Sequence, residues 1–346
     1  MEAIWSYDIS LYREPVGVFL GIAPYNFPAM IPFGWFMPLC LVAGNTMVIK
    51  AASMVPQTGM RLLELLIEAG LPEGVVNLIT CSRQEVSRLL SHPDIRGISF
   101  VGSTSTGVKI YSEAAAAGKR VQCLTEAKNH ALLLEDAPLE WSAQRIINSG
   151  FGCAGQRCMA LPVVVVQESV ADRFVQILKG MAERLVVGAA YDPATQLGPV
   201  INAAHKQSVI NWIDKGVAEG ASLILDGRKC APKGFEDGFF VGPTIFDHVA
   251  PGMPVGDQEI FGPVVCIKRV RDFEEGLGLM NANPFANGSS IFTQSGHYAR
   301  EFVRHTDGGM VGVNVGIPVP LAFFPFSGNK QSFFGDLHVL GRDGLR

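Results

Sequence analysis

The chain has 346 residues, of which 48% are hydrophobic and 17% charged, and its formal net charge is −4. This length suggests about two domains with large apolar cores. A slightly acidic chain without blocks of basic residues lacks the electrostatic footprint of nucleic-acid binding. The seven cysteines are spread without the spacing of metal ligands, which indicates a reducing compartment and no metal site.

The N-terminus has no basic region followed by an apolar core, so no signal peptide is apparent and we expect a cytoplasmic protein. The apolar run at 30–49 raises the question of a membrane span. Because Pro32, Gly34, Pro38 and Asn45 interrupt it, a buried helix that leads into a buried strand explains it better. We therefore expect no membrane association.

Apolar runs of strand length alternate with amphipathic stretches in the first third of the chain. We predict strands at 16–23, 46–50, 75–80 and 97–102, and helices at 56–69, 85–91 and 105–117. The last of these strands is largely apolar, with Ile98, Phe100 and Val101, as expected of a parallel strand covered by helices on both faces.

A second series of elements begins after residues 127–130. Four consecutive valines mark a strand at 161–167. We predict further strands at 264–270, 289–293 and 310–315, and helices at 170–185, 202–219, 273–281 and 297–305. The fold class is therefore α/β, with two domains built on open, mostly parallel twisted sheets flanked by helices.

The segment Ile22-Ala-Pro-Tyr-Asn-Phe-Pro28 directly follows the first predicted strand. Asn26 would then lie at the carboxyl end of a parallel strand, where open α/β sheets bind ligands, and its amide could stabilise an oxyanion. The alternative is a proline-flanked turn in which Asn26 caps a helix.

Two further segments are candidates for binding a nucleotide. Phe100-Val-Gly-Ser-Thr-Ser-Thr-Gly107 joins a strand to a helix, so its backbone N–H groups could hold a phosphate. An ordinary capped helix start explains this loop equally well. In Glu259-Ile-Phe-Gly-Pro-Val264, the carboxylate could bind the paired hydroxyls of a ribose. The alternative is an exposed acid in a turn, which is common for a lone glutamate.

The run Phe151-Gly-Cys-Ala-Gly-Gln-Arg-Cys158 places a cysteine after small residues that leave room for a substrate. Arg157 is adjacent, and a nearby cation lowers the pKa of a thiol, whose thiolate is the nucleophile of covalent catalysis. Arg157 is also a candidate partner for a substrate carboxylate. No histidine nearby suggests a papain-like pair, and we interpret Cys153 as a bystander.

In this order and spacing, the segments resemble the aldehyde dehydrogenase superfamily, and within it the CoA-acylating branch of the methylmalonate-semialdehyde dehydrogenases. The resemblance runs from about Tyr12 to the last residues. The motifs that carry it are Pro24-Tyr-Asn-Phe-Pro28, His92-Pro-Asp-Ile, Ala127-Lys-Asn-His130, Gly155-Gln-Arg-Cys-Met-Ala160, Asp226-Gly-Arg-Lys, Glu259-Ile-Phe-Gly-Pro and Val313-Asn-Val-Gly-Ile-Pro-Val-Pro320.

The resemblance implies that Cys158 is the nucleophile and Asn26 the oxyanion donor. Within a site for NAD, with NADP as the alternative, Gly102 and Ser103 correspond to the pyrophosphate loop and Glu259 to the acid that binds the nicotinamide ribose. Ser53 replaces the family's glutamate at the adenosine ribose. The implied cofactor-binding residues are Ala23, Tyr25, Lys50, Ser53, Gly102, Ser103, Glu259 and Phe261.

The resemblance also implies a division of the chain into four segments. These are a partial oligomerisation strand at 1–15, an NAD(P)-binding domain at 16–127, a catalytic domain at 128–326 and a C-terminal segment at 327–346. Both ends are shorter than in the family. Family members form homodimers or homotetramers, and we expect the same here.

Leu124 stands where hydrolytic members have a glutamate base, and leucine cannot activate water. The resemblance therefore implies that a small semialdehyde, malonate or methylmalonate semialdehyde, is oxidised through a Cys158 thioester. The acyl group then passes to CoA, giving acetyl-CoA or propionyl-CoA, a step of valine catabolism.

Three alternatives stay open. Glu126, where the family has glycine, could be a displaced base of a hydrolytic enzyme, because residues two apart in a strand share a face. A truncated relative could bind ligands without turnover. An esterase or thioesterase could use Cys158 alone.

Overall fold

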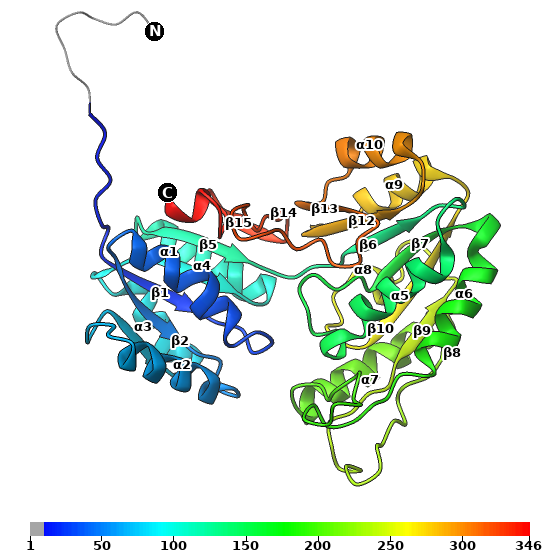
Figure 1. Cartoon of the computed structure of the whole chain (residues 1–346), viewed down its shortest axis with the longest axis horizontal. Helices are drawn as coiled ribbons and strands as arrows, with labels where there is room; N and C mark the ends of the chain where they lie inside the picture. Colours follow the sequence, from blue (N-terminus) through cyan, green and yellow to red (C-terminus); the bar gives the residue numbers. More distant parts are fainter. Residues whose placement is uncertain (1–9) are drawn as a thin grey trace, which may run out of the picture. The chain divides into compact units, whose positions relative to one another are not determined.

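The computed structural model describes residues 10–346, which belong to two compact units (Figure 1). The first unit comprises the residues up to 100 together with 112–121 and 344–346, and the second comprises 101–111 and 122–343. The predicted strand at 1–15 lies largely outside the described residues, and those of it that are described, 10–15, form no strand. Between residues 10 and 346, no helix is long and apolar enough to cross a bilayer.

The first unit contains parallel strands in the order β4-β1-β2-β3. Their register aligns Ile22 of β1 with Lys50 of β2, and Lys50 with Ile79 of β3, so the carboxyl ends of three strands meet at one edge. In chain order the elements are β1 (Val18–Ile22), the π-helix η1 (Met30–Phe36), α1 (Met37–Val42), β2 (Thr46–Lys50), α2 (Pro56–Glu68), β3 (Val76–Ile79), α3 (Arg83–Ser91), β4 (Ile95–Val101) and α4 (Thr104–Ala116).

Local sequence signals explain where these elements begin. The apolar run at 30–49 forms η1, α1 and β2, as predicted for a buried helix that leads into a strand. Pro56 stands in the first turn of α2, where its missing N–H costs no hydrogen bond. A capping box starts α3: Glu85 N–H donates to the Ser82 hydroxyl, and Ser82 N–H donates to the Glu85 carboxylate.

The second unit is built on a seven-stranded sheet with the order β13-β12-β6-β7-β10-β9-β8. Every pair in it is parallel except β8 with β9. The remaining elements are β5 (Arg120–Leu124), β6 (His130–Leu133), α5 (Leu139–Gly150), the 3-10 helix η2 (Gly152–Gly155), β7 (Val163–Gln167), α6 (Glu168–Ala182), α7 (Ala203–Ala218), β8 (Ser222–Leu225), β9 (Thr244–Asp247), α8 (Pro254–Asp257), β10 (Val264–Val270), α9 (Phe273–Asn281), β11 (Phe285–Ala286), β12 (Gly288–Phe292), α10 (Gly296–His305), β13 (Met310–Val313), β14 (Asn329–Lys330), β15 (Phe333–Gly335) and η3 (Asp343–Leu345).

The four valines of β7 show why this strand is continuously apolar. Val164 and Val166 belong to a core with residues of α5 and α6. Val163 and Val165 point to the other face and belong to a core with residues of α7 and α9. A strand buried on both faces cannot alternate with polar residues, so the predicted parallel sheet between helices is confirmed.

Two short antiparallel pairings complete the fold. β15 pairs with β5, with Phe333 opposite Leu124, and β11 pairs with β14. The strand predicted at 310–315 ends at Val313, because Asn314 has a left-handed φ of 57°. The division into four segments at residues 15, 127 and 326 stays a proposal.

Candidate active site

A tight left-handed turn after α5 positions Cys158. Cys153 and Ala154 have φ values of 53° and 55°, and Gly155 has a φ of 70°. A Cβ at Gly155 would lie 2.1 Å from the carbonyl oxygen of Gly262, so a side chain there would clash. This close approach brings the Cys158 segment against the segment that carries Glu259.

Two asparagines hold the carbonyl of Cys158. Asn129 Nδ2 donates to it at 2.8 Å and Asn287 Nδ2 at 3.0 Å. Asn129 also donates to the Ala160 carbonyl and accepts from Gly288 N–H, each at 2.8 Å. Sequence reasoning did not select either asparagine as a site residue, although Asn129 lies in the Ala127–His130 motif. Both fix the backbone on which the thiol is carried.

Burial dominates the acidity of the Cys158 thiol. Desolvation raises its pKa to about 12, with a contribution from the negative charge of Glu259. Hydrogen bonds from the backbone N–H groups of Cys158 and Met159 lower the pKa, and the charge of Arg157 lowers it by the smallest amount. The prediction that Arg157 lowers the thiol pKa thus names a real effect, but desolvation outweighs it.

Arg157 is directed to the turn itself. Its Nε donates to Cys153 Sγ at 3.1 Å, and its Nη1 donates to the Asn148 carbonyl at 3.4 Å. Cys153, interpreted from the sequence as a bystander, is therefore a hydrogen-bond partner of Arg157. Substrate binding by Arg157 stays a proposal.

Glu259 is the acid of this region, and its carboxylate accepts from Ala127 N–H at 2.9 Å. Desolvation raises the pKa of Glu259 to about 8. The Ala127 hydrogen bond lowers the pKa, while the charge of Glu126 raises it. Phe261 follows in a left-handed conformation with a φ of 57°, and its carbonyl is 2.8 Å from His205 Nε2.

The predicted phosphate loop is engaged by the protein itself. Gly102 N–H donates to the Leu124 carbonyl at 3.1 Å, and Thr104 N–H donates to Oε2 of Glu126 at 2.8 Å. The Ser103 hydroxyl donates to Thr106 Oγ1 at 2.9 Å. The neighbouring segment 124–126 thus supplies acceptors for the N–H groups of Gly102 and Thr104. Phosphate binding by this loop stays a prediction.

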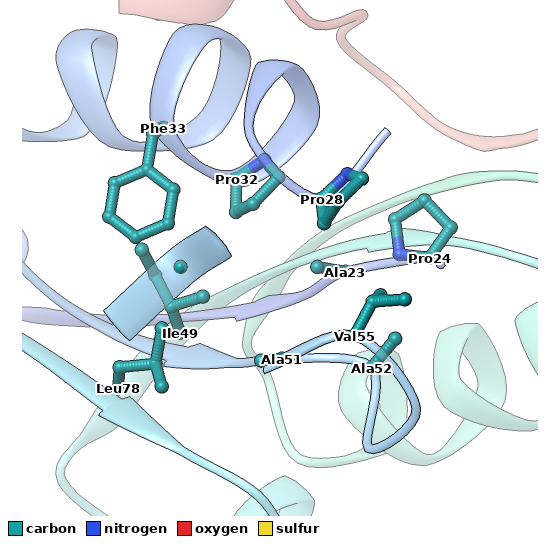
Figure 2. Close-up of a pocket in the computed structure, with 11 residues that line it drawn as sticks. Ala23, Pro24, Pro28, Pro32, Phe33, Ile49, Ala51, Ala52, Val55 and Leu78 are labelled. Atoms are coloured by element: carbon teal, nitrogen blue, oxygen red, sulfur yellow. The ribbon is translucent and has the colours of Figure 1, made fainter. Parts of the chain in front are cut away.

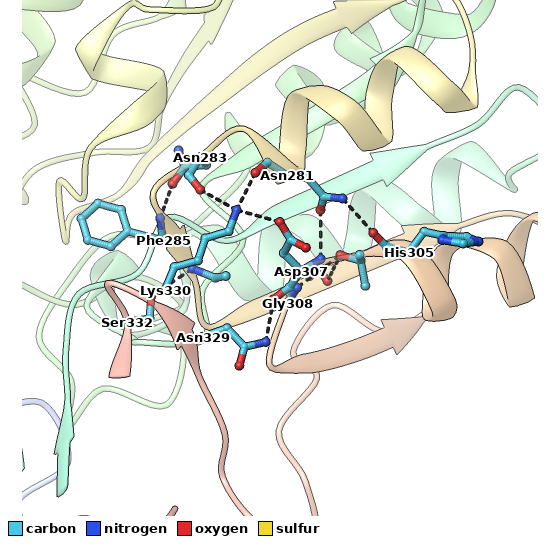
Figure 3. Close-up of polar contacts among 12 residues, drawn as sticks. Asn281, Asn283, Phe285, His305, Asp307, Gly308, Asn329, Lys330 and Ser332 are labelled. Atoms are coloured by element: carbon cyan, nitrogen blue, oxygen red, sulfur yellow. Dashed lines mark hydrogen bonds and ion pairs between the residues drawn. The ribbon is translucent and has the colours of Figure 1, made fainter. Parts of the chain in front are cut away.

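Glu126 lies beyond the end of β5 at Leu124, so the argument that both residues share a strand face does not apply. Its main chain is held by Ser332, whose hydroxyl donates to the Glu126 carbonyl at 2.7 Å. Figure 3 shows how the segment around Ser332 is fixed: Lys330 Nζ lies 2.8 Å from Oδ2 of Asp307 and donates to the Asn283 carbonyl at 3.1 Å.

The first unit carries the other predicted site residues. Ala23 follows β1, and its N–H donates to the carbonyl of Lys50, the last residue of β2, at 3.0 Å. Tyr25 and Asn26 follow Pro24 and are half-buried, whereas Ser53 is exposed. A small pocket opens at these strand ends, and most of its lining is apolar; it includes Ala23, Pro24, Ala51, Ala52 and Val55 (Figure 2).

The structure thus groups the predicted residues in two sets. Cys158, Arg157, Gly102, Ser103, Glu259 and Phe261 belong to the second unit, and Ala23, Tyr25, Asn26, Lys50 and Ser53 belong to the first. Throughout residues 10–346 there is no group of three or more His, Cys, Asp or Glu side chains suited to a metal ion.

Comparison with known proteins points to one family. The model of the aldehyde dehydrogenase family matches residues 1–346. Malonate-semialdehyde dehydrogenase 2 of Geobacillus thermodenitrificans (strain NG80-2) is 48% identical over 338 residues, which are 98% of this chain and 70% of that protein. Malonate-semialdehyde dehydrogenase 1 of Oceanobacillus iheyensis is 46% identical over 98% of this chain and 69% of its own length.

Solved structures agree with this comparison. A Sinorhizobium meliloti 1021 protein, assigned as a methylmalonate-semialdehyde dehydrogenase and complexed with NAD, superposes with a TM-score of 0.94. The two sequences are 43% identical, and the match covers 96% of this chain and 68% of that one. The methylmalonate-semialdehyde dehydrogenase of Oceanimonas doudoroffii also has a TM-score of 0.94, at 41% identity over 96% of this chain and 68% of that one.

Proposed function

Because the chain belongs to the aldehyde dehydrogenase family, we propose that it oxidises malonate or methylmalonate semialdehyde with NAD and transfers the acyl group from Cys158 to CoA. The observation that carries this proposal is the packing of the Cys158 turn on the Glu259 segment. A second support comes from the sequence, because β5 ends in Leu124 where a hydrolytic enzyme would need a carboxylate. Under this proposal Cys158 is the thiol nucleophile, and Leu124 cannot serve as the base for hydrolysis.

The residues present suit a dinucleotide. The Thr104 N–H at the start of α4 already binds a carboxylate oxygen, so this loop accepts anionic oxygens. Glu259 offers a carboxylate for ribose hydroxyls, and apolar residues at the ends of β1 and β2, among them Ala23 and Ala51, offer a surface for a base. We propose Gly102, Ser103, Glu259 and Phe261 for the nicotinamide and diphosphate half. For the adenosine half we propose Ala23, Tyr25, Lys50 and Ser53, with NADP as the alternative cofactor. When bound, the nicotinamide supplies the hydride acceptor.

The chain's own residues perform the covalent steps. The Cys158 thiolate adds to the aldehyde carbon and forms a C–S bond, while the carbonyl oxygen becomes an alkoxide. The Asn26 amide donates to this oxygen; removal of one such donor typically costs about 10²–10³ in rate. Loss of the hydride restores the carbonyl and leaves a thioester on Cys158.

The second half of the reaction depends on Leu124. This side chain is buried and cannot accept a proton from water, so the thioester is protected from base-assisted hydrolysis. The CoA thiolate attacks the thioester carbon, and the Cys158 thiolate leaves. With methylmalonate semialdehyde, the carboxylate is lost as carbon dioxide, the carbon that carried it takes up a proton from water, and the product is propionyl-CoA. Malonate semialdehyde gives acetyl-CoA by the same steps.

The test is NADH formation by the purified chain with each semialdehyde, with and without CoA, compared with Cys158→Ala. We expect CoA-dependent NADH formation that the variant lacks. Equal rates without CoA would favour a hydrolytic enzyme. Equal signals from both proteins would favour a relative without turnover, and ester cleavage without NAD that Cys158→Ala abolishes would favour an esterase.

We further propose that the chain forms a homodimer or homotetramer in the cytoplasm and acts in valine catabolism. The family resemblance supports the assembly. Light scattering coupled to size exclusion measures it directly, and a monomeric mass would contradict it.

A further inference from the structure

We propose that the Glu126 carboxylate is a tethered competitor for the diphosphate of the dinucleotide and thereby sets the affinity of this chain for its cofactor. This inference rests on the proposed function and identifies a residue that tunes it. It starts from a departure in the sequence, since Glu126 stands where the family has glycine.

The carboxylate occupies an anion position. Glu126 Oε2 accepts from the N–H of Thr104, the first residue of α4, at 2.8 Å. In return, Glu126 N–H donates to Thr104 Oγ1 at 3.3 Å. The N-terminus of a helix favours negative charge through its N–H groups and its dipole. A diphosphate that binds at the same N–H therefore has to displace a group that is already anionic.

The main chain around Glu126 cannot retreat with the side chain. Ser332 anchors the Glu126 carbonyl, and Thr125 N–H donates to the Ser332 carbonyl at 3.0 Å. Thr125 Oγ1 donates to the Gln331 carbonyl at 2.6 Å. Only rotation of the Glu126 side chain can vacate the position, and the rotated carboxylate stays tethered to the same backbone.

Electrostatics places Glu126 close to a second proposed cofactor contact. The Glu259 carboxylate accepts from the N–H of Ala127, the residue after Glu126, at 2.9 Å. In keeping with this geometry, the negative charge of Glu126 raises the pKa of Glu259. A bound diphosphate would therefore meet a like charge at the loop and near the ribose acid. Like charges a few ångströms apart in a partly buried site repel strongly, so we expect the wild-type chain to bind the dinucleotide on the order of tenfold more weakly than a chain without this carboxylate.

The experiment is calorimetric titration of the intact chain with three ligands: NAD and ADP-ribose, which carry the diphosphate, and adenosine, which lacks it. Glu126→Gly removes both the charge and the side chain, and Glu126→Gln removes the charge alone. The matched control is Glu85→Gln, because Glu85 accepts from Ser82 N–H at the start of α3 in the same kind of helix cap.

We expect Glu126→Gly to lower the Kd of NAD and ADP-ribose by about tenfold, with a smaller decrease for Glu126→Gln, and neither variant to change the Kd of adenosine. Glu85→Gln should change none of the three. Binding of NAD to Glu126→Gly but not to the wild-type chain would be the strongest support.

Equal Kd values of NAD for wild type and both Glu126 variants would overturn the inference and leave the proposed function standing. A tighter Kd for adenosine as well would also overturn it, because the change would then act on the pocket and not on the diphosphate. No binding of NAD or ADP-ribose to any variant would overturn the proposed function together with the inference.

Discussion

Substitution of Glu259 by Gln should stabilise the folded chain at high pH and have little effect at low pH. Gln keeps an oxygen that can accept from Ala127 N–H but cannot ionise. The wild-type carboxylate has a pKa raised from 4.5 to about 8, mainly by desolvation. Below pH 4.5 the folded and unfolded chains both hold the proton, so the raised pKa has no effect on stability.

As the pH rises from 4.5 to about 8, the unfolded chain releases the proton while the folded chain keeps it, and the folded state loses stability. A shift from 4.5 to about 8 at about 1.36 kcal/mol for each pKa unit gives an upper limit of about 5 kcal/mol. Because Glu259 keeps part of its surface in water, we expect about half of that, roughly 2–3 kcal/mol. Loss of the carboxylate should at the same time weaken NAD binding.

The assay is urea unfolding of wild type and Glu259→Gln at pH 5 and pH 9, followed by tryptophan fluorescence. The free energy of unfolding of the variant minus that of wild type should be larger at pH 9 than at pH 5. Glu85→Gln is the control of opposite sign: the hydrogen bond from Ser82 lowers the pKa of Glu85, so its loss should cost stability as the pH rises. If the free energies of unfolding of Glu259→Gln and wild type differed by the same amount at pH 5 and pH 9, the reasoning would be refuted.

Three further predictions concern the turn and its supports. Because burial raises the pKa of the Cys158 thiol to about 12, its rate of alkylation by iodoacetamide should still increase about tenfold per pH unit above pH 9. Trypsin cleavage after Arg157 places Cys158 and Cys153 in different peptides, so mass spectrometry measures the alkylation of each thiol separately. An alkylation rate that reaches its plateau below pH 9 would contradict the raised pKa. Asn129→Ala should lower the free energy of unfolding by about 3 kcal/mol, because the carbonyls of Cys158 and Ala160 and the N–H of Gly288 lose a hydrogen-bond partner. The same variant should have a lower kcat. A variant with unchanged stability and kcat would count against the positioning role of Asn129. Gly155→Ala should abolish soluble active protein. Gly220 also has a positive φ, 92°, but open space surrounds its Cβ position, so Gly220→Ala should lower the free energy of unfolding by only about 1–2 kcal/mol. A similar loss of stability in both variants would mean that the close approach of Gly155 to the Gly262 carbonyl is not decisive.

Elements with strong local signals were predictable from the sequence. The helix predicted at 273–281 has those bounds because Asp272 caps it by accepting from Glu275 N–H, and the strand predicted at 46–50 is β2. β5, β6 and α5 were not predicted. β15 has only three residues, and its pairing with β5 joins segments about two hundred positions apart, which a local pattern cannot reveal.

The sequence indicated candidate site residues but not their electrostatics, and the roles of these residues stay predictions. The spacing of small residues indicated Cys158, and the structure brings its turn against the Glu259 segment. From the adjacent Arg157 we predicted a lowered pKa for the Cys158 thiol, but the pKa is raised. Desolvation causes the increase, and it depends on atoms from many segments that a local sequence pattern does not reveal. Asn129 and Asn287 were missed for the same reason, since they meet at one carbonyl from distant positions.

The antiparallel pairing of β15 with β5 also bears on how the chain is made. During synthesis, β5 is complete at Leu124, but the residues that pair with its edge begin only at Phe333. At about 5–20 residues per second, the ribosome takes roughly 10–40 s to supply them. Over that interval the nascent chain exposes an unpaired strand edge, which favours pairing with other chains. Expression at lower temperature or with a holding chaperone should therefore raise the soluble yield more for this protein than for a chain whose edge strand is synthesised next to its partner.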